Sequence, residues 1–389
     1  MTNIVTNETA ENRNLGFPVG PLGLIALPGC EEMVQAIDGY LSYWRKDRTL
    51  EVNGYKKDSF IIDVSLPRFG SGEGKGVINE SVRGMDLYIF VDVCNYSVEY
   101  KMYGEKNPMS PDDHYANLKR VIAAATGKPK RITVVMPFLY ESRQHKRSSR
   151  ESLDCAMALQ ELSAMGVTNI ITFDAHDPRV QNAIPMKGFE TIMPTYQFVK
   201  KMLKTEDLII DPDHMMVISP DEGAVGRAIY FSNMLGLDVG MFYKRRDYTR
   251  IVNGKNPIVA HEFLGSSVEG KDVIIVDDMI ASGDSIIDVA KQLKSRGARK
   301  VFACATFGLF TAGMDVFDRA KKEGLIDRIY TTNLIYQNPN VLRRDYYVSV
   351  DMGEYIAGLV DSMNHDASIE PLLSPTVKIQ KRVNEFKNR

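Results

Sequence analysis

The chain has 389 residues, long enough for two to three domains, and its 44% hydrophobic and 25% charged residues are typical of folded globular proteins. It has 48 Lys and Arg against 50 Asp and Glu, which gives a net charge of -2. The chain therefore lacks the basic excess that is typical of proteins that coat nucleic acid or anionic membranes. Four scattered cysteines are too few for a disulfide framework, and the longest uncharged apolar stretch, Val301–Met314, is too short to span a membrane. We therefore predict a soluble cytoplasmic protein that binds neither nucleic acid nor membrane.

After a polar tail at residues 1–20, short apolar runs alternate with helix-length segments. The predicted strands are Phe60–Val64, Leu87–Val93, Arg131–Met136, Asn169–Phe173, Met215–Ser219, Val273–Val276 and Val301–Thr306. The predicted helices are Ser152–Met165, Ala224–Leu235 and Ser285–Arg296. The last of these carries apolar residues three and four positions apart and ends before Gly297. Strands that alternate with helices predict parallel α/β sheets, and the length accommodates two.

The proline- and glycine-containing segment 184–194 is the best candidate for a domain boundary. The predicted organisation is a polar tail at 1–20, an N-terminal α/β domain at 21–187, a C-terminal α/β domain at 188–360 and an extension at 361–389. The basic end of the extension, from Lys378, is interpreted as a solvated helix or tail. Residues 244–271 show no core periodicity, which predicts a long loop of the kind that often closes over a site.

The strongest local motif is VIIVDDMIASGDS at residues 273–285, followed by an amphipathic helix. An apolar strand presents Asp277 and Asp278 at its carboxyl end, and a loop of small residues then leads into the helix. Backbone N–H groups in such loops and the positive end of a helix bind phosphate, and Ser282 and Ser285 add hydroxyl donors. Because the two acids would repel the phosphate, we expect them to face sugar hydroxyls or Mg²⁺. A plain strand–turn–helix connection capped by Ser285 is the structural alternative.

This motif resembles the ribose-phosphate-binding signature of type I phosphoribosyltransferases. Further motifs, in order along residues 25–358, make the chain similar to the ribose-phosphate pyrophosphokinases, also called phosphoribosyl pyrophosphate synthetases. They are INESVRG at 78–84, RQ at 143–144, DAH at 174–176, SPD at 219–221, KRR at 244–246, ATFGLF at 305–310 and TN at 332–333. The resemblance implies two tandem phosphoribosyltransferase-like domains, each a mainly parallel sheet flanked by helices.

The resemblance also implies an activity, in which the pyrophosphoryl group of ATP moves to the C1 hydroxyl of ribose 5-phosphate, giving 5-phosphoribosyl 1-pyrophosphate and AMP. Mg²⁺ is the implied cofactor, and a homo-oligomer built from dimers, up to a hexamer, is the implied assembly. The implied catalytic residues are Lys244 and Arg246, and the implied metal-associated residues are His176 and Asp221. The implied ATP-binding residues are Phe69, Ser71, Gly72, Glu73, Arg143 and Gln144. The implied ribose-phosphate-binding residues are Asp277, Asp278, Ala281, Ser282, Gly283, Asp284 and Ser285.

Some positions depart from the family pattern, namely Ser71, Arg179, Ala281, Asp284 and Phe307. Asp284 stands where glycine is common, and its carboxylate would repel a phosphate unless it turned to the N–H groups of Ile286 or Ile287. We expect that second arrangement, a helix cap. Two other interpretations stay open: a catalytically weak regulatory homologue, and a phosphoribosyltransferase, which would have little use for the adenine-side residues.

Overall fold

The computed structural model describes residues 15–246 and 258–387, and the chain divides into two compact units. Unit 1 comprises Met1–Met193, Leu334–Tyr336 and Asp351–Ser374, and unit 2 comprises Pro194–Asn333, Gln337–Val350 and Pro375–Arg389. The chain thus enters unit 2 at the end of the segment 184–194 and returns to unit 1 twice. These returns were not anticipated, because they depend on which surfaces the late segments pack against.

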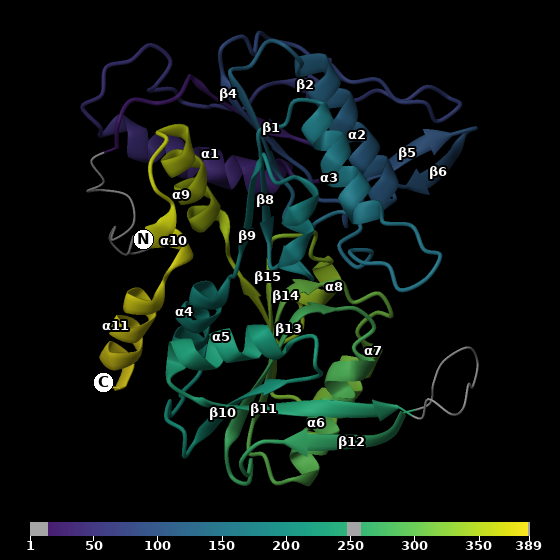
Figure 1. Ribbon diagram of the computed structural model, residues 1–389, viewed down its shortest axis with the longest axis vertical. Coiled ribbons are helices and arrows are strands. Elements are labelled where there is room, and N and C mark those ends of the chain that lie inside the picture. The colour runs from purple at the N-terminus through teal and green to yellow at the C-terminus, as the bar shows by residue number, and fades with distance from the viewer. Residues whose placement is uncertain (1–14, 247–257, 388–389) are drawn as a thin grey trace. The chain divides into compact units, whose positions relative to one another are not determined.

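Unit 1 contains a five-stranded parallel sheet in the order β1-β4-β7-β8-β9 (Figure 1). Its strands are β1 (Leu22–Ala26), β4 (Asp86–Phe90), β7 (Arg131–Val135), β8 (Asn169–Phe173) and β9 (Gly188–Ile192). Two antiparallel pairs accompany it, β2 (Val64–Ser65) with β3 (Val77–Ile78) and β5 (Glu99–Met102) with β6 (Glu105–Pro108). The helices are α1 (Glu31–Lys46), α2 (Pro111–Ala125), α3 (Asp154–Ala164), the 3-10 helix η1 (Pro178–Ala183), α9 (Gly353–Asn364) and α10 (Glu370–Leu373).

Unit 2 contains a seven-stranded sheet in the order β12-β11-β10-β13-β14-β15-β16, parallel except where β12 runs antiparallel to β11. Its strands are β10 (Met215–Ser219), β11 (Asp238–Arg246), β12 (Ile258–Leu264), β13 (Asp272–Ile280), β14 (Val301–Gly308), β15 (Arg328–Thr332) and β16 (Tyr347–Val350). Its helices are α4 (Thr195–Thr205), α5 (Val225–Leu235), α6 (Asp284–Ser295), α7 (Asp315–Lys322), α8 (Pro339–Leu342) and α11 (Thr376–Lys387).

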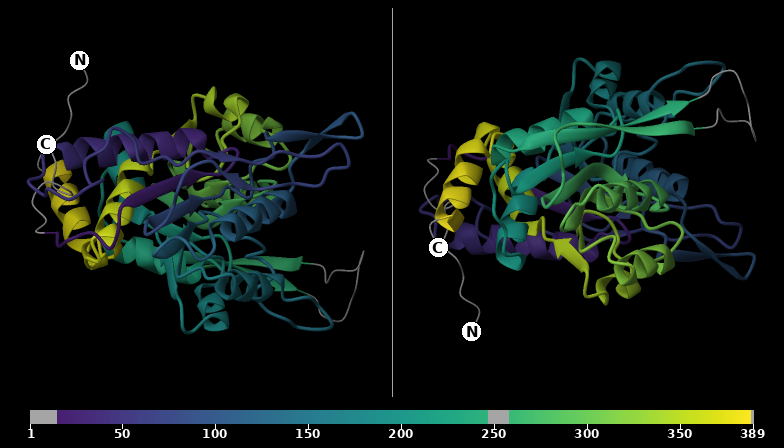
Figure 2. Two further views of the ribbon diagram at one scale, coloured as in Figure 1. Left: turned by 90° about the horizontal axis from the view of Figure 1, so that it is seen from above. Right: turned by 90° about the horizontal axis from the view of Figure 1, so that it is seen from below.

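The central strands of unit 2 are buried on both faces, so they read as continuous apolar runs. Alternate residues serve different cores. Val273 and Ile275 of β13 pack with α6 and α7 on one face, whereas Ile274 and Val276 pack with α4, α5 and α11 on the other (Figures 1 and 2). The expected architecture of parallel sheets flanked by helices is therefore confirmed. Within the described residues, no helix is both long and apolar enough to cross a bilayer.

Most predicted strands and all three predicted helices are confirmed to within a few residues, but Phe60–Val64 is wrong as a strand. Only Val64 belongs to a strand, β2, and Ile61 meets Leu24 of β1 through one isolated parallel bridge. Phe60 and Ile62 are buried, so the apolar pattern here reflects core packing rather than a ladder. The basic C-terminal stretch forms α11, one side of which is buried through Ile379 and Val383.

The long loop predicted at 244–271 is also wrong in part. Residues 244–246 complete β11, and residues 258–264 form β12, which pairs with it. The rings of Phe242 and Phe263 lie 5.1 Å apart and join the two strands. β12 lies at the edge of the sheet, where a strand needs no strict alternation of apolar residues. Residues 258–264 were for this reason not recognised as a strand. Residues 247–257 of the predicted loop lie outside the described residues.

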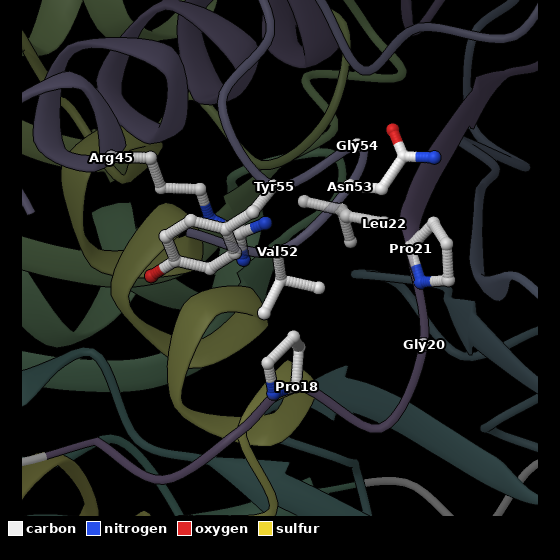
Figure 3. A pocket seen from close by; sticks show the side chains of 9 residues that line it. All are labelled: Pro18, Gly20, Pro21, Leu22, Arg45, Val52, Asn53, Gly54 and Tyr55. Carbon is white, nitrogen blue, oxygen red and sulfur yellow. The ribbon is translucent and has the colours of Figure 1, made fainter. Parts of the chain in front are cut away.

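A buried ionic network joins α1 to α9 within unit 1, where the two helices lie side by side (Figures 1 and 2). Asp361 accepts hydrogen bonds from Arg45, which is 1% exposed, and from Arg48, with nearest distances of 3.1 and 2.6 Å. His365 Nδ1 donates to the Asp361 carbonyl at 2.7 Å, so its Nε2 accepts from Tyr55 at 3.0 Å. Figure 3 shows Arg45 and Tyr55 beside a cavity of about 60 Å³, which holds only a few water molecules and is no nucleotide site.

This network makes the stability of unit 1 depend on pH. Burial lowers the pKa of His365. Burial alone would raise the pKa of Asp361, but Arg48 and Arg45 outweigh it and hold that pKa below its ordinary value. The unfolded chain therefore binds more protons than the folded chain in acid, and we expect the free energy of unfolding to fall as pH drops below about 6.5. Urea titrations from pH 7 to 5 measure this slope.

His365→Gln is expected to flatten the slope between pH 6.5 and 5. An identical pH dependence in the parent and in His365→Gln would contradict the assignment of the slope to this network.

Candidate active site

Two loops of unit 1 leave neighbouring parallel strands at the same sheet edge, where α/β proteins commonly bind ligands. The loop after β7 carries Arg143, Gln144 and His145, and the loop after β8 carries His176. The rings of His145 and His176 lie 5.2 Å apart at 61°. The structure thus brings His176 together with the residue that directly follows the Arg143-Gln144 motif, 31 residues earlier in the sequence.

His145 was not among the predicted site residues. Its side chain is 10% exposed, its Nε2 lies 3.5 Å from Asp177 Oδ2, and its Nδ1 has no hydrogen-bond partner among the described residues. A hydrogen bond from Arg179 lowers the pKa of Asp177 to about 2, although burial opposes this. Arg179, one of the residues that depart from the family pattern, therefore forms an ion pair with Asp177. The available signal for His145 was its position directly after Arg143-Gln144.

The glycine-rich loop at 69–73 is closed by its own hydrogen bonds. Phe69 N–H donates to the Glu73 carbonyl at 2.8 Å, and Ser71 Oγ donates to Glu73 Oε2 at 2.8 Å. Gly72 has a φ of 95°, and a Cβ there would lie 2.7 Å from Met102 of β5. The Phe69 ring is 57% exposed, which suits a residue expected to contact a base. Arg143 is also exposed, whereas Gln144 donates to the Ser152 carbonyl at 3.0 Å.

Three acids gather at the corresponding edge of unit 2. Asp221 follows β10, and Asp277 and Asp278 lie in the part of neighbouring β13 that continues beyond β10. The predicted strand Val273–Val276 is thus too short, because β13 continues through both acids paired with β14. Arg227 of α5 was not among the predicted site residues. Its guanidinium lies 4.0 Å from a carboxylate oxygen of Asp277 and 4.0 Å from one of Asp278. It sits six residues after Asp221, on the helix that follows that loop.

The acidic pair is electrostatically strained. Burial raises the pKa of Asp277 well above its usual range, and repulsion by Asp278 and Asp221 adds to this rise. The Arg227 guanidinium and the Asp278 N–H act in the opposite direction. A cation or hydroxyl donors from a bound ligand would relieve this repulsion.

The described residues fit a magnesium ion only with ligands from outside the protein. No three His, Cys, Asp or Glu side chains of the described chain converge closely enough to hold a metal by themselves. One oxygen of Asp221 already accepts from the N–H groups of Gly223 and Ala224, at 2.9 and 3.2 Å. Mg²⁺ commonly takes one or two carboxylates and completes its shell with water and substrate phosphates, so the donor set is compatible with it. His176 belongs to unit 1 and Asp221 to unit 2.

The loop at 281–285 turns from β13 into α6 as expected. Gly283 has a φ of 93°, and a Cβ there would lie 2.2 Å from the ring of Phe317, so only glycine fits. Thr311 N–H donates to the Ala281 carbonyl at 3.0 Å and ties the loop to the end of β14. The loop therefore has a defined conformation at the positive end of α6, as a phosphate-binding loop requires.

The helix cap expected from Asp284 is wrong. Asp284 is the first residue of α6, Gly283 is the capping residue, and no side chain caps the helix. The Ile287 N–H donates to the Gly283 carbonyl, while the exposed Asp284 carboxylate accepts from Ser282 Oγ at 2.9 Å. A residue already inside the first turn cannot reach N–H groups two and three residues ahead, as a true capping residue does.

The expected catalytic cations also differ in setting from the prediction. Lys244 and Arg246 were expected in a loop, but their backbones lie at the end of β11, where they pair with His261 and Ile258 of β12.

Comparisons with known proteins agree with this architecture. Residues 24–166 match the model of the N-terminal domain of ribose phosphate pyrophosphokinase, and residues 249–374 match the model of the phosphoribosyl synthetase-associated domain. The ribose-phosphate pyrophosphokinase of Aquifex aeolicus is 29% identical over 258 residues, covering 64% of this chain and 73% of the relative. That of Vibrio parahaemolyticus is 28% identical over 316 residues, covering 80% and 91%. The structure of phosphoribosylpyrophosphate synthetase from Mycobacterium smegmatis has the same fold, with a TM-score of 0.70 at 20% identity over 89% of this chain and 99% of that one.

Proposed function

Because the chain belongs to the ribose-phosphate pyrophosphokinase family, we propose that it transfers the pyrophosphoryl group of ATP to the C1 hydroxyl of ribose 5-phosphate. The products are 5-phosphoribosyl 1-pyrophosphate and AMP. The observation that carries the proposal on the structural side is the edge of unit 2, where buried acids precede a fixed loop at the start of a helix. This is the arrangement that holds a sugar by its hydroxyls and its phosphate at once.

In unit 2, Asp277 and Asp278 would accept hydrogen bonds from the ribose hydroxyls, with Arg227 limiting their repulsion. The loop from Ala281 to Ser285 would face the 5-phosphate. In unit 1, the Phe69–Glu73 loop, Arg143 and Gln144 would bind ATP, with Phe69 offering its exposed ring to adenine. The site residues need little covalent chemistry, because the transfer depends on positioning and charge neutralisation.

The family uses Mg²⁺, which when bound neutralises charge on the polyphosphate. The family resemblance implies that His176 in unit 1 and Asp221 in unit 2 are each associated with metal. Since Mg²⁺ prefers oxygen, His176 would act through water or directly on a phosphate, with His145 packed against its ring. Lys244 and Arg246 would stabilise the charge that develops on the transferring group. Like other members of the family, the chain would act as a homo-oligomer in the cytoplasm.

The direct test is an assay of the purified chain with ribose 5-phosphate, ATP and Mg²⁺. Formation of AMP together with a pyrophosphorylated sugar, followed by NMR or chromatography, is the expected result. The exposed Asp284 carboxylate in the phosphate loop favours one second candidate, a catalytically weak regulatory homologue. A regulatory homologue would bind ATP but release no AMP. A phosphoribosyltransferase would neither bind ATP nor release AMP.

The acidic pair gives a quantitative test. Asp277→Asn is expected to raise the KM for ribose 5-phosphate about tenfold, because a hydrogen bond to a charged group contributes roughly 1.5–3 kcal/mol. The KM for ATP should change less than threefold. Steady-state kinetics with each substrate varied in turn measures both. Asp238→Asn, at an exposed acid that begins β11, is the control for loss of one charge in the same unit. Equal changes in both KM values would indicate a structural role for the pair.

A further inference from the structure

Arg68, which directly precedes the glycine-rich loop at 69–73, fastens that loop to two neighbouring elements of unit 1. Its guanidinium donates one hydrogen bond to the Gly72 carbonyl of the loop at 2.9 Å. It donates a second to Asp113 Oδ1 of α2 at 3.3 Å, and its central carbon lies 4.3 Å from the centroid of the Tyr100 ring of β5. One side chain thus connects the loop to a helix and to the hairpin of β5 and β6.

Both supports of this guanidinium are held in place by the fold. The other carboxylate oxygen of Asp113 accepts hydrogen bonds from the Ser110 N–H and Oγ, at 3.1 and 3.0 Å, as part of the capping box of α2. Oδ1 of Asp113 therefore stays directed toward the guanidinium. Tyr100 lies opposite Asn107 in the β5–β6 ladder, which fixes its backbone. The guanidinium consequently has a defined position from which to hold the loop.

The hairpin also contacts the loop through its own backbone. The Tyr103 N–H, at the turn between β5 and β6, donates to the Gly70 carbonyl at 2.8 Å. Arg68 and Phe69 are neighbours in the chain but differ in exposure, because the Arg68 side chain is 11% exposed whereas Phe69 is 57% exposed. Arg68 therefore makes its hydrogen bonds within unit 1 and leaves Phe69 as the residue that can meet a base.

We infer that Arg68 is a positioning residue for ATP, which holds the loop Phe69–Glu73 in the conformation that receives the nucleotide without touching the nucleotide itself. The inference rests on the proposed function, which assigns this loop to ATP, and it adds the residue that orders the loop. A loop that is held before binding loses less conformational freedom when the ligand arrives, so the complex is tighter. A guanidinium suits this role because its fixed N–H directions serve a carbonyl and a carboxylate at once, whereas a lysine ammonium is a single point charge.

The test compares ATP binding with catalysis in variants of the full chain. Arg68→Ala is expected to raise the Kd for ATP with Mg²⁺, measured by isothermal titration calorimetry, about tenfold, which corresponds to the loss of one hydrogen bond from a charged group. The KM for ATP should rise by a similar factor. The kcat and the KM for ribose 5-phosphate should stay within about twofold, because their proposed residues lie in unit 2. Arg68→Lys should raise the Kd only about threefold, because the ammonium keeps the charge but replaces one of the two hydrogen bonds.

Tyr100→Leu removes the ring beneath the guanidinium and leaves Arg68 in place. It is expected to raise the Kd for ATP about two- to fivefold, the range of a cation–π contact. In the Arg68→Ala background the same change should add less than about twofold, because both residues act through one contact. The controls are Tyr100→Phe, which keeps the ring, and Lys106→Ala, which breaks an exposed ion pair of the same hairpin. Both should stay within about twofold of the parent.

The outcomes separate this inference from the proposed function. AMP release by Arg68→Ala with an unchanged Kd for ATP overturns the inference and leaves the pyrophosphokinase activity standing. Equal increases in the KM for ATP and for ribose 5-phosphate, or full additivity with Tyr100→Leu, also overturn the inference, since they indicate a general structural role. Weaker ATP binding by Arg68→Ala, in a parent that binds ATP but releases no AMP, supports the inference and overturns the proposed activity.

Two remaining results also decide the question. A parent that does not bind ATP overturns the proposed function and this inference together. If Arg68→Ala does not fold, Arg68→Lys and Tyr100→Leu test the inference by the same measurement, and an unchanged Kd for ATP in both overturns it.

Discussion

Lys244→Ala is expected to lower kcat about 10²- to 10³-fold while the KM for ATP changes less than threefold. The proposed role of Lys244 is to meet charge that develops only as the pyrophosphoryl group transfers. The loss of such a donor removes transition-state stabilisation, roughly 3–4 kcal/mol in known cases, without weakening the ground-state complex. Initial rates of AMP release at saturating substrates give kcat, and titration with ATP gives KM.

Arg245→Ala is the matched control for this prediction. It removes a neighbouring positive charge from the same end of β11, and the family resemblance gives it no catalytic role. We expect its kcat to stay within a few-fold of the parent. If Lys244→Ala also turned over within a few-fold of the parent, the proposed catalytic role of Lys244 would be wrong.

Asp361→Ala is expected to lower the free energy of unfolding by about 3–5 kcal/mol. Asp361 is the acid that Arg45 and Arg48 share, and Arg45 is almost completely buried. Without the carboxylate, a guanidinium would remain in the interior with no opposite charge nearby, which costs more than the intact pair contributes. Urea unfolding of the full chain, followed by fluorescence or circular dichroism, measures the loss.

A surface ion pair from the same part of unit 1 provides the comparison. Asp366 lies 3.4 Å from Arg131 and is 80% exposed, so Asp366→Ala should cost less than about 1 kcal/mol. Asp361→Asn should cost less than Asp361→Ala, because the amide oxygen still accepts one hydrogen bond. Similar losses for Asp361→Ala and Asp366→Ala would show that the buried network contributes no more than a surface contact.

Several elements were predictable because their signals are local. The strands Asn169–Phe173 and Met215–Ser219 and the helix after Gly283 follow from apolar runs and helical spacing, and the structure has them within a residue or two. The position of the loop Ala281–Ser285 was equally predictable, since small residues and a glycine between a strand and a helix mark a turn. The order of the motifs along the chain also indicated the family, and that order can be recognised without any knowledge of contacts.

Other features depend on partners that are distant in the sequence. Strand β12 and the last three residues of β11 were read as a loop, because the edge strand β12 carries little apolar pattern. His145 and Arg227 were missed because their proximity to His176 and to the acidic pair arises only when separate loops meet at a sheet edge. Asp284 was misread as a cap because α6 begins at Asp284, one residue earlier than predicted, so that Gly283 occupies the capping position.

The sequence by itself determined the class of fold, the order of most strands and helices, and the family, because apolar periodicity and short motifs are properties of neighbouring residues. Only the tertiary structure decided that the segment after Val350 returns to unit 1, where Asp361 of α9 meets Arg45 of α1. It alone showed that the carboxylate of Asp284 stays exposed in the phosphate loop. For Asp361 the physical reason is that its partner Arg45 lies on a helix more than 300 residues earlier in the chain, and short-range pattern contains no information about how such distant segments pack.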